Sequence, residues 1–313
     1  MSNWKILITD GLHPDGITIL ADFAQVDDRP GLHESDLLEI IADYHALIVR
    51  GQTRVTAKIL NAAPNLRVVG RAGVGVNNID LAAAQSRQVT VVNAPTAPTI
   101  AVAEHTLGLM LALVRHIPQA NASVKSGLWQ KQNFLGSELY AKTLGIIGMG
   151  KIGSAVAQRA AAFGMTALGH DPLIPNTEIK NSGASPVSLN ELYARSDFIS
   201  LHLPLTPQTR GMINGQTLGY MKRGVYLINT ARGEQIDETA LLNALETGQV
   251  AGAALDVFSD KPPGLSALVA HPQVIVTPHL GAQTSESQAR AAVDIAEEII
   301  AVLDGNPVRW KIV

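Results

Sequence analysis

The sequence predicts an α/β protein with two doubly wound parallel sheets. Short apolar segments alternate with helix-forming segments along nearly the whole chain, which is typical of parallel strands joined by helices. The chain has 313 residues, a length that predicts about two domains, each with its own core.

Composition excludes several classes of protein. The net charge of −3 gives no basic surface, so no nucleic-acid partner is expected. The absence of cysteine excludes disulfides and thiolate metal sites, and no metal is expected. The N-terminal residues lead directly into an apolar segment, with no room for a signal peptide, and no apolar run approaches the ~18 residues of a membrane helix. We therefore expect a cytoplasmic protein with no membrane partner.

In the first hundred residues we expect strands at Trp4–Thr9, Ala46–Val49, Leu66–Val69 and Val89–Val92, and helices at Pro14–Phe23, Glu34–Asp43, Thr56–Ala62 and Asp80–Arg87. Loops beyond the carboxyl ends of parallel strands are where such sheets bind ligands. Two of these loops, at residues 50–53 and 70–75, combine arginine with glycine. Their N–H groups can hold a carboxylate, and Arg50 or Arg71 can hold a second anion. The alternative is that both loops are ordinary turns with solvated arginines.

Residues 93–100 predict a hinge, because their prolines break both strands and helices. A long apolar helical pattern follows, and Pro118 interrupts it before a second helical segment. So much apolar surface indicates subunit contact, and we predict a homodimer built mainly through residues 99–140. Burial of this helix within one chain is the alternative. We interpret His105 and His116 as packing or surface residues.

A glycine-rich turn, Gly148-Met-Gly-Lys-Ile-Gly153, separates an apolar strand at Leu144–Ile147 from a helix expected at Ser154–Phe163. The first glycine permits a tight turn, the second lets the backbone approach a pyrophosphate, and the third lets helix and strand pack closely. Asp171 follows at the end of a second apolar segment. A carboxylate there can accept both ribose hydroxyls and repels a 2′-phosphate, so the sequence predicts NAD as cofactor.

Further strands are expected at Phe198–Leu201, Val225–Asn229, Val250–Leu255 and Val274–Val276, with helices at Leu189–Ala194, Asn214–Met221 and Glu238–Thr247. They complete a sheet of about six strands. Arg232, Asp256 and His279 each follow one of these strands. An arginine can bind a carboxylate and polarise an adjacent carbonyl, and a histidine can exchange a proton with the same oxygen. Together they predict a hydride-transfer site, although each alone could be structural.

Six motifs carry a resemblance to a known family: Gly145–Gly153, His170–Pro172, His202–Thr206, Asn229–Gly233, Ala254–Phe258 and Thr277–Gly281. With them the chain resembles the D-isomer-specific 2-hydroxyacid dehydrogenases over essentially its whole length. The resemblance implies two Rossmann-like domains. An NAD-binding domain, residues 99–284, is inserted into a substrate-binding domain formed by residues 1–98 and 285–313, which a final helix at Thr284–Asp304 completes.

The same resemblance implies site residues. Arg232 and His279 are the implied catalytic pair. The implied cofactor-binding residues are Val74, Gly148, Gly150, Lys151, Ile152, Gly153, Asp171, Pro204, Thr230, Ala231, Asp256 and Gly281.

Within the family, Val49-Arg50, Gly70–Asp80 and Gly127–Lys131 resemble the D-3-phosphoglycerate dehydrogenases. This likeness implies oxidation of 3-phosphoglycerate to 3-phosphohydroxypyruvate, the first committed step of serine biosynthesis. It also implies Lys131 of a neighbouring subunit as a phosphate ligand, and these further substrate-binding residues: Arg50, Gly51, Gly73, Val74 and Gly75. Because the chain ends at Val313, no regulatory serine-binding domain is expected.

Other functions stay open. One alternative has the same type of reaction, hydride transfer with a 2-hydroxy or 2-oxo acid: the chain also resembles a hydroxypyruvate or glyoxylate reductase. From a different class, it resembles the C-terminal-binding co-repressors, which are NAD-sensing binding modules. The retained Arg232 and His279 disfavour that last interpretation.

The sequence departs from the family pattern immediately before Pro262. The family has a glutamate there that holds the catalytic histidine, whereas this chain has Lys261, with Asp260 one residue earlier. A lysine has no acceptor for an imidazole N–H. We predict that Asp260 takes the place of the glutamate as a catalytic residue. The alternatives are that His279 works without an orienting carboxylate, or that activity is weak.

Overall fold

The computed structural model describes residues 3–313, which form two compact units. One unit runs up to Pro98 and resumes at Ala282, and the other spans Thr99–Gly281. The substrate-binding domain expected from the sequence ends at residue 98 and resumes at residue 285.

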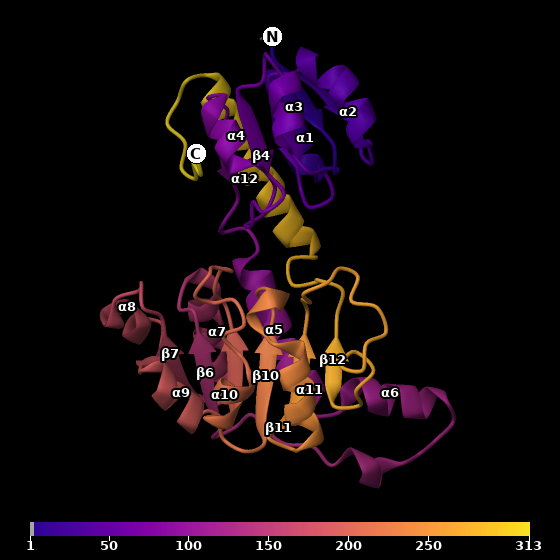
Figure 1. Cartoon of the computed structure of the whole chain (residues 1–313), viewed down its shortest axis with the longest axis vertical. Coiled ribbons are helices and arrows are strands. Elements are labelled where there is room, and N and C mark those ends of the chain that lie inside the picture. The colour runs from indigo at the N-terminus through magenta and orange to yellow at the C-terminus, as the bar shows by residue number, and fades with distance from the viewer. Residues whose placement is uncertain (1–2) are drawn as a thin grey trace. The chain divides into compact units, whose positions relative to one another are not determined.

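The first unit, drawn in indigo to purple with its C-terminal helix in yellow (Figure 1), has a five-stranded sheet. The strand order is β2-β1-β3-β4-β5, with every strand pair parallel. Its elements are β1 Lys5–Ile8, α1 Pro14–Phe23, β2 Gln25–Asp28, α2 Glu34–Ile40, η1 Ile41–Asp43, β3 Ala46–Val49, α3 Ala57–Ala62, β4 Val68–Arg71, α4 Leu81–Ser86, β5 Thr90–Asn93 and α12 Ser285–Leu303. Alternate residues of β3 face opposite sides of the sheet. Ile48 packs with α1 and α12, and Leu47 packs with α2, α3 and α4.

The second unit has a seven-stranded parallel sheet in the order β12-β11-β10-β9-β6-β7-β8. Its strands are β6 Thr143–Ile147, β7 Thr166–His170, β8 Ser185–Pro186, β9 Phe198–Leu201, β10 Val225–Asn229, β11 Val250–Leu255 and β12 Val274–Val276. Its helices are α5 Thr99–Val114, α6 Ile117–Lys125, η2 Lys131–Phe134, α7 Lys151–Ala162, α8 Asn176–Asn181, α9 Leu189–Arg195, α10 Gly215–Gly219, η3 Gly233–Gln235 and α11 Glu238–Glu246.

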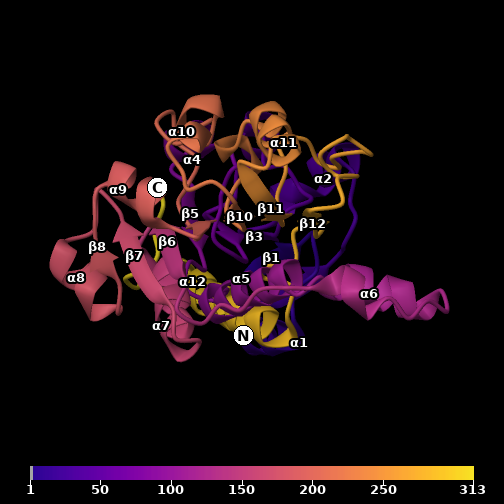
Figure 2. The same ribbon diagram turned by 90° about the horizontal axis from the view of Figure 1, so that it is seen from below.

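Helices cover both faces of this second sheet. Figure 2 shows α5 and α7 against one face and α9, α10 and α11 against the other. Within β10, Ile228 packs on the side of α5 and α7, and Leu227 packs on the opposite side. The strand order reverses between β6 and β9, and ligands of such sheets bind at the carboxyl ends of the strands beside this point.

Several elements differ from the sequence prediction. The second sheet has seven strands rather than six, because the two-residue β8 adds a short edge to β7. The sequence does not predict β2, which carries two aspartates and pairs only with β1. The helix α7 begins at Lys151, not at Ser154, because Gly150 is its N-cap. The break after α5 lies at His116, with φ +53°, and Pro118 sits in the first turn of α6.

Among the residues from 3 onward, no single helix is long and apolar enough to cross a membrane. The helices α5 and α6 reach that length and composition only as a pair, which is bent by 61°.

Candidate active site

The structure places the predicted site residues in loops that follow the carboxyl ends of strands. In the second unit they follow β6, β7, β9, β10, β11 and β12, at Gly148–Gly153, Asp171, Pro204, Thr230–Arg232, Asp256 and His279–Gly281. In the first unit they follow β3 and β4, at Arg50-Gly51 and Gly73–Gly75. Lys131 lies elsewhere, at the start of η2, and is exposed.

The turn between β6 and α7 has the geometry of a pyrophosphate cradle. Gly148 has φ +95°, and a Cβ there would lie 2.5 Å from the carbonyl oxygen of His202. A Cβ at Gly153 would lie 2.0 Å from the carbonyl oxygen of Gly148, so α7 packs on the turn only because Gly153 has no side chain. A Cβ at Gly150 would meet nothing within 4 Å. The space beside Gly150, at the N-terminus of α7, is therefore open, and a helix N-terminus with such space beside it is a binding site for a pyrophosphate.

Asp171 is fixed beside this turn. Its Oδ2 accepts the backbone N–H of Met149 at 2.9 Å, and its Oδ1 accepts that of Leu173 at 2.9 Å. Each carboxylate oxygen has further acceptor capacity, so both ribose hydroxyls of NAD can donate to it. The sequence-predicted cofactor residues of this region thus fit the adenosine half of a dinucleotide.

We expect NAD to bind at least tenfold more tightly than NADP, because placing a 2′-phosphate beside the fixed Asp171 carboxylate costs at least ~1.4 kcal/mol. Titration calorimetry with NADH and NADPH measures the difference. Asp171→Ala should narrow it, while Glu178→Ala, which removes an exposed acid from α8, should leave it unchanged. Equal dissociation constants for the two cofactors in the unmodified protein would contradict the role of Asp171.

Arg232 is held in a closed turn after β10. The Asn229 side chain accepts the N–H of Ala231 and donates to the carbonyl of Arg232, both at 2.9 Å. Gln235 accepts the N–H of Arg232 at 3.3 Å and donates to the carbonyl of Leu203 at 2.8 Å. Burial lowers the pKa of the Arg232 guanidinium, which still stays charged at neutral pH. The turn therefore presents a fixed cation at the carboxyl end of β10.

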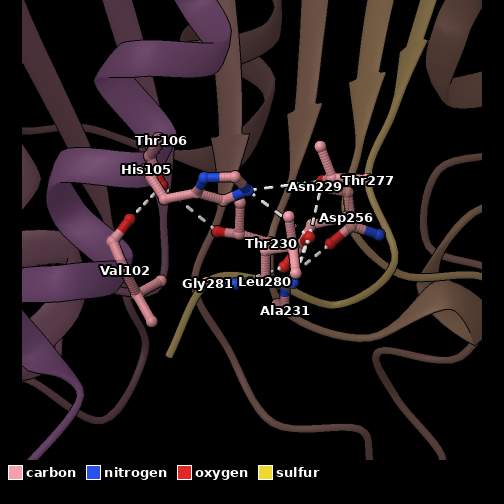
Figure 3. Close-up of polar contacts among 10 residues, drawn as sticks. All are labelled: Val102, His105, Thr106, Asn229, Thr230, Ala231, Asp256, Thr277, Leu280 and Gly281. Carbon is pink, nitrogen blue, oxygen red and sulfur yellow. Dashed lines mark hydrogen bonds and ion pairs between the residues drawn. The ribbon is translucent and has the colours of Figure 1, made fainter. Parts of the chain in front are cut away.

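Asp256 organises the loop that carries His279 (Figure 3). Its Oδ1 accepts the N–H of Leu280 at 2.7 Å and the hydroxyl of Thr277 at 2.6 Å, and its Oδ2 accepts the N–H of Gly281 at 2.9 Å. Its own carbonyl accepts the N–H of His279 at 3.0 Å. His279 is held at φ +58°, a left-handed conformation that is uncommon outside glycine. Asp256 thus fixes the strained backbone of the predicted catalytic histidine.

Asp256 is 1% exposed, and its carboxylate stays ionised near neutral pH. Burial alone would raise its pKa. Hydrogen bonds from His105, Thr277, Leu280 and Gly281 outweigh burial and hold the pKa below its usual range. A permanent negative charge therefore lies directly behind the loop of His279.

His202, which follows β9, differs from His279 in its surroundings. Burial lowers the pKa of His202 to about 3, so its imidazole is neutral near pH 7. The hydroxyl of Ser200 lies 2.8 Å from its Nε2. His279 is instead exposed. Of these two imidazoles, that of His279 is the more accessible.

A cavity of about 400 Å³ adjoins His279. Its lining includes Asp256, Phe258, Lys261, Pro262, Thr277 and His279. Asp260 and Lys261 are both exposed, and of the two only Lys261 lines the cavity. The contact of Asp260 with His279 stays a prediction.

In the first unit, Asp10 organises the loop after β3. Its Oδ2 accepts the N–H of Arg50 at 2.7 Å and that of Gln52 at 3.0 Å, and its Oδ1 accepts the hydroxyl of Thr53 at 2.5 Å. Arg71 supports the same loop by donating from Nε to the carbonyl of Arg50 at 2.9 Å. Asp10 belongs to no motif, and only its position after a strand could have indicated this role.

The loop after β4 is supported in a similar way. Asn93 donates from its side chain to the carbonyl of Val74 at 2.7 Å, and Ala94 donates its N–H to the carbonyl of Gly73 at 2.9 Å. A Cβ at Gly73 would lie 1.7 Å from the Arg71 guanidinium. This glycine therefore lets Arg71 pass beneath the loop, and the predicted substrate loops of this unit are both ordered.

Comparisons with known proteins identify the family to which this chain is similar. The sequence model described as "D-isomer specific 2-hydroxyacid dehydrogenase, NAD binding domain" matches residues 107–281. The chain is 49% identical to a D-3-phosphoglycerate dehydrogenase of Synechocystis sp., over 97% of this chain and 55% of that protein. It is 50% identical to a D-3-phosphoglycerate dehydrogenase of Methanocaldococcus jannaschii, over 96% of this chain and 58% of that protein. The chain thus spans a little over half the length of these curated relatives.

Among solved structures, a glyoxylate reductase from Paecilomyes thermophila matches with a TM-score of 0.89 and 30% identity. The match covers 100% of this chain and 99% of that one.

Proposed function

The chain belongs to the D-isomer specific 2-hydroxyacid dehydrogenases, and from this premise we propose that it transfers hydride between NAD and a D-2-hydroxy acid. The observation that carries the proposal is the grouping at the carboxyl ends of β10, β11 and β12. There the fixed cation of Arg232 and the loop of His279, ordered by the buried Asp256, follow neighbouring strands of one sheet.

The residues have complementary tasks in this reaction. NAD, when bound, supplies the hydride acceptor for the substrate C2. The Arg232 guanidinium binds the substrate carboxylate and, in the oxo acid, polarises the neighbouring carbonyl. The His279 imidazole takes the proton of the C2 hydroxyl in oxidation and returns it in reduction. Asp256 keeps the His279 backbone in place and adds negative charge beside the site, which favours the imidazolium that forms when His279 takes a proton.

We further propose 3-phosphoglycerate as the substrate, which places the reaction at the first step of serine biosynthesis, and we expect it to run in the cytoplasm. The names of the relatives support this choice, and so do the ordered loops at Arg50 and Gly73–Gly75. The similarity to a glyoxylate reductase keeps glyoxylate and hydroxypyruvate as the alternative substrates.

A spectrophotometric panel separates these substrates. D-3-phosphoglycerate with NAD, and 3-phosphohydroxypyruvate, hydroxypyruvate and glyoxylate with NADH, are compared by kcat/KM. We expect the highest value in the reducing direction for 3-phosphohydroxypyruvate. Lys131→Gln should lower kcat/KM for phosphorylated acids only, because the remaining substrates have no phosphate for the ammonium to bind. Lys58→Gln, which removes an exposed ammonium from α3, should leave kcat/KM unchanged for all of the substrates. A preference for unphosphorylated acids would favour the reductase.

We propose the homodimer that the sequence predicts through residues 99–140, with its contact narrowed to residues 117–140, because most of α5 is already buried within the second unit. The helix α6 has no buried residue. Several large apolar side chains of this surface are exposed in the single chain: Ile117, Val124, Leu128, Trp129, Leu135 and Tyr140. Trp129 is 84% and Leu135 is 89% exposed. Isolated exposed apolar residues are ordinary, but a cluster of them marks an interaction surface.

Light scattering at micromolar concentration should give twice the chain mass of 33.1 kDa. Leu135→Glu should shift the protein towards the monomer, because a dimer would bury the new charge without a partner. Leu173→Glu is the matched control, since Leu173 is 87% exposed and lies outside this surface. A monomeric unmodified protein would refute the dimer and, with it, the role of Lys131 from a neighbouring subunit.

A further inference from the structure

His105 lies on α5, outside every motif that carries the family resemblance, yet it reaches the centre of the strand-end network. Its Nε2 is 3.4 Å from Oδ1 of Asp256 and 3.3 Å from Oγ1 of Thr277. Figure 3 shows the imidazole extending from α5 to these two side chains. The interpretation of His105 from the sequence as a packing or surface residue omits these contacts.

The neighbours of Nε2 determine which ring nitrogen carries a hydrogen. The ionised carboxylate of Asp256 can only accept hydrogen bonds. The hydroxyl hydrogen of Thr277 already goes to Asp256, across 2.6 Å, so Thr277 can only accept from His105. Both groups facing Nε2 are therefore acceptors, and Nε2 must be the donor.

We propose that His105 is a positioning residue for hydride transfer. Its Nε2–H holds the side chains of Asp256 and Thr277, and through them it holds the loop Thr277–Gly281 that carries His279. The inference rests on the proposed function for its kinetic consequences, whereas the tautomer of His105 does not depend on that function.

The next residue of α5 extends this support to the neighbouring turn. Thr106 donates its hydroxyl to the carbonyl of Val102 at 2.8 Å and lies 3.2 Å from the hydroxyl of Thr230. With its own hydrogen used, Thr106 accepts from Thr230. Adjacent side chains of α5 thus contact three loops at the strand ends. Thr106 contacts Thr230 in the loop after β10, and His105 contacts Asp256 after β11 and Thr277 after β12.

Among the four groups that stabilise the Asp256 carboxylate, His105 is the one from outside the segment 256–281. The amides of Leu280 and Gly281 and the hydroxyl of Thr277 belong to the same loop that Asp256 orders. They move with the loop, whereas His105 is anchored in α5, where Val102, Ala103, Thr106 and Leu107 are buried. Loss of the His105 donor leaves the Asp256 carboxylate with hydrogen-bond donors from its own loop only.

A set of substitutions separates positioning from packing. The amide nitrogen of His105→Gln reaches roughly where Nε2 lies and can donate, whereas that of His105→Asn reaches only the position of Nδ1. His105→Phe keeps the ring and removes the donor. We expect the Asn and Phe variants to lose about tenfold or more in kcat, with smaller changes in KM, unchanged Tm and one NADH bound per chain. The Gln variant should recover most of the lost kcat.

Two results would overturn the proposal. One is an unchanged kcat in both the Asn and Phe variants. The other is an equal loss in the Gln, Asn and Phe variants that follows a lowered Tm, because that pattern describes packing alone.

An experiment without turnover tests the same contact. Nitrogen-15 NMR of the imidazoles, with the His105 signals assigned by their absence in His105→Gln, should show the hydrogen on Nε2. A His105 ring with its only hydrogen on Nδ1 would overturn the proposal even if every variant were active. If the unmodified protein oxidises no hydroxy acid, the proposed function fails, and the tautomer still decides whether His105 holds Asp256 and Thr277.

Discussion

Replacing His279 with asparagine should lower kcat by ~10²–10⁴-fold, because no other group would take the hydroxyl proton in the transition state. Asparagine is the matched substitution at this position. His279 has φ +58°, and asparagine adopts the left-handed conformation more readily than most residues. The loop should therefore keep its shape, and the loss should reflect the missing imidazole.

The measurement combines steady-state kinetics with NADH binding. We expect the dissociation constant for NADH to stay close to that of the unmodified protein, because the cradle at Gly150 and the carboxylate of Asp171 are untouched. His33→Asn serves as a control, since His33 is exposed in the first unit, before α2. A kcat that survives in His279→Asn would assign the proton transfer to another group.

Removing the carboxylate of Asp260 should lower kcat by about tenfold or more, if Asp260 replaces the glutamate that the family places before Pro262. An imidazolium forming at His279 needs a carboxylate on its other nitrogen, to orient the ring and to stabilise the charge. Asp260 is shorter than glutamate and precedes the family position by one residue. It can reach His279 only if its loop brings it inward.

Two variants, Asp260→Asn and Lys261→Glu, test directly whether Asp260 replaces the family glutamate. We expect Asp260→Asn to reduce kcat and Lys261→Glu to add little. Lys261 lines the cavity beside His279 and Asp260 does not, which makes the opposite result informative. If Lys261→Glu strongly raised kcat while Asp260→Asn left kcat unchanged, the lysine would have impaired the activity of this chain, and Asp260 would have no catalytic role.

The sequence predicts correctly the strands whose residues are buried on both faces of the sheet. The limits of β9, β10, β11 and β12 match their predicted ranges, because an apolar run bounded by turns has few alternatives in a doubly wound fold. The predicted starts at Thr56 and Asp80 are N-caps, whose side chains accept the N–H groups of Ile59 and Ala83.

The edge strands β2 and β8 could not be predicted in this way. The strand β2 contains no residue that is fully buried, and β8 has only two residues, one of them proline. An edge strand needs less apolar surface than a central one, and without an apolar run the sequence pattern resembles a loop.

The candidate site likewise contains some residues that the sequence identifies and others that it does not. Arg232, Asp256 and His279 are recognisable because each follows a buried strand. His105 and Asp10 act through contacts with residues distant in the sequence, at separations of 172 residues from Thr277 and 40 from Arg50. No local pattern encodes such contacts, so only the folded structure shows which groups these two side chains hold.

The hydrogen at C2 of the substrate offers the most direct test of the proposed reaction. D-3-phosphoglycerate that carries deuterium at C2 is incubated with NAD and the unmodified protein, and the NADH formed is analysed by mass spectrometry. We expect each NADH molecule to carry one deuterium, and we expect the L-isomer to give no NADH. Absence of deuterium from the NADH, or equal turnover of the two isomers, would contradict hydride transfer from a D-2-hydroxy acid.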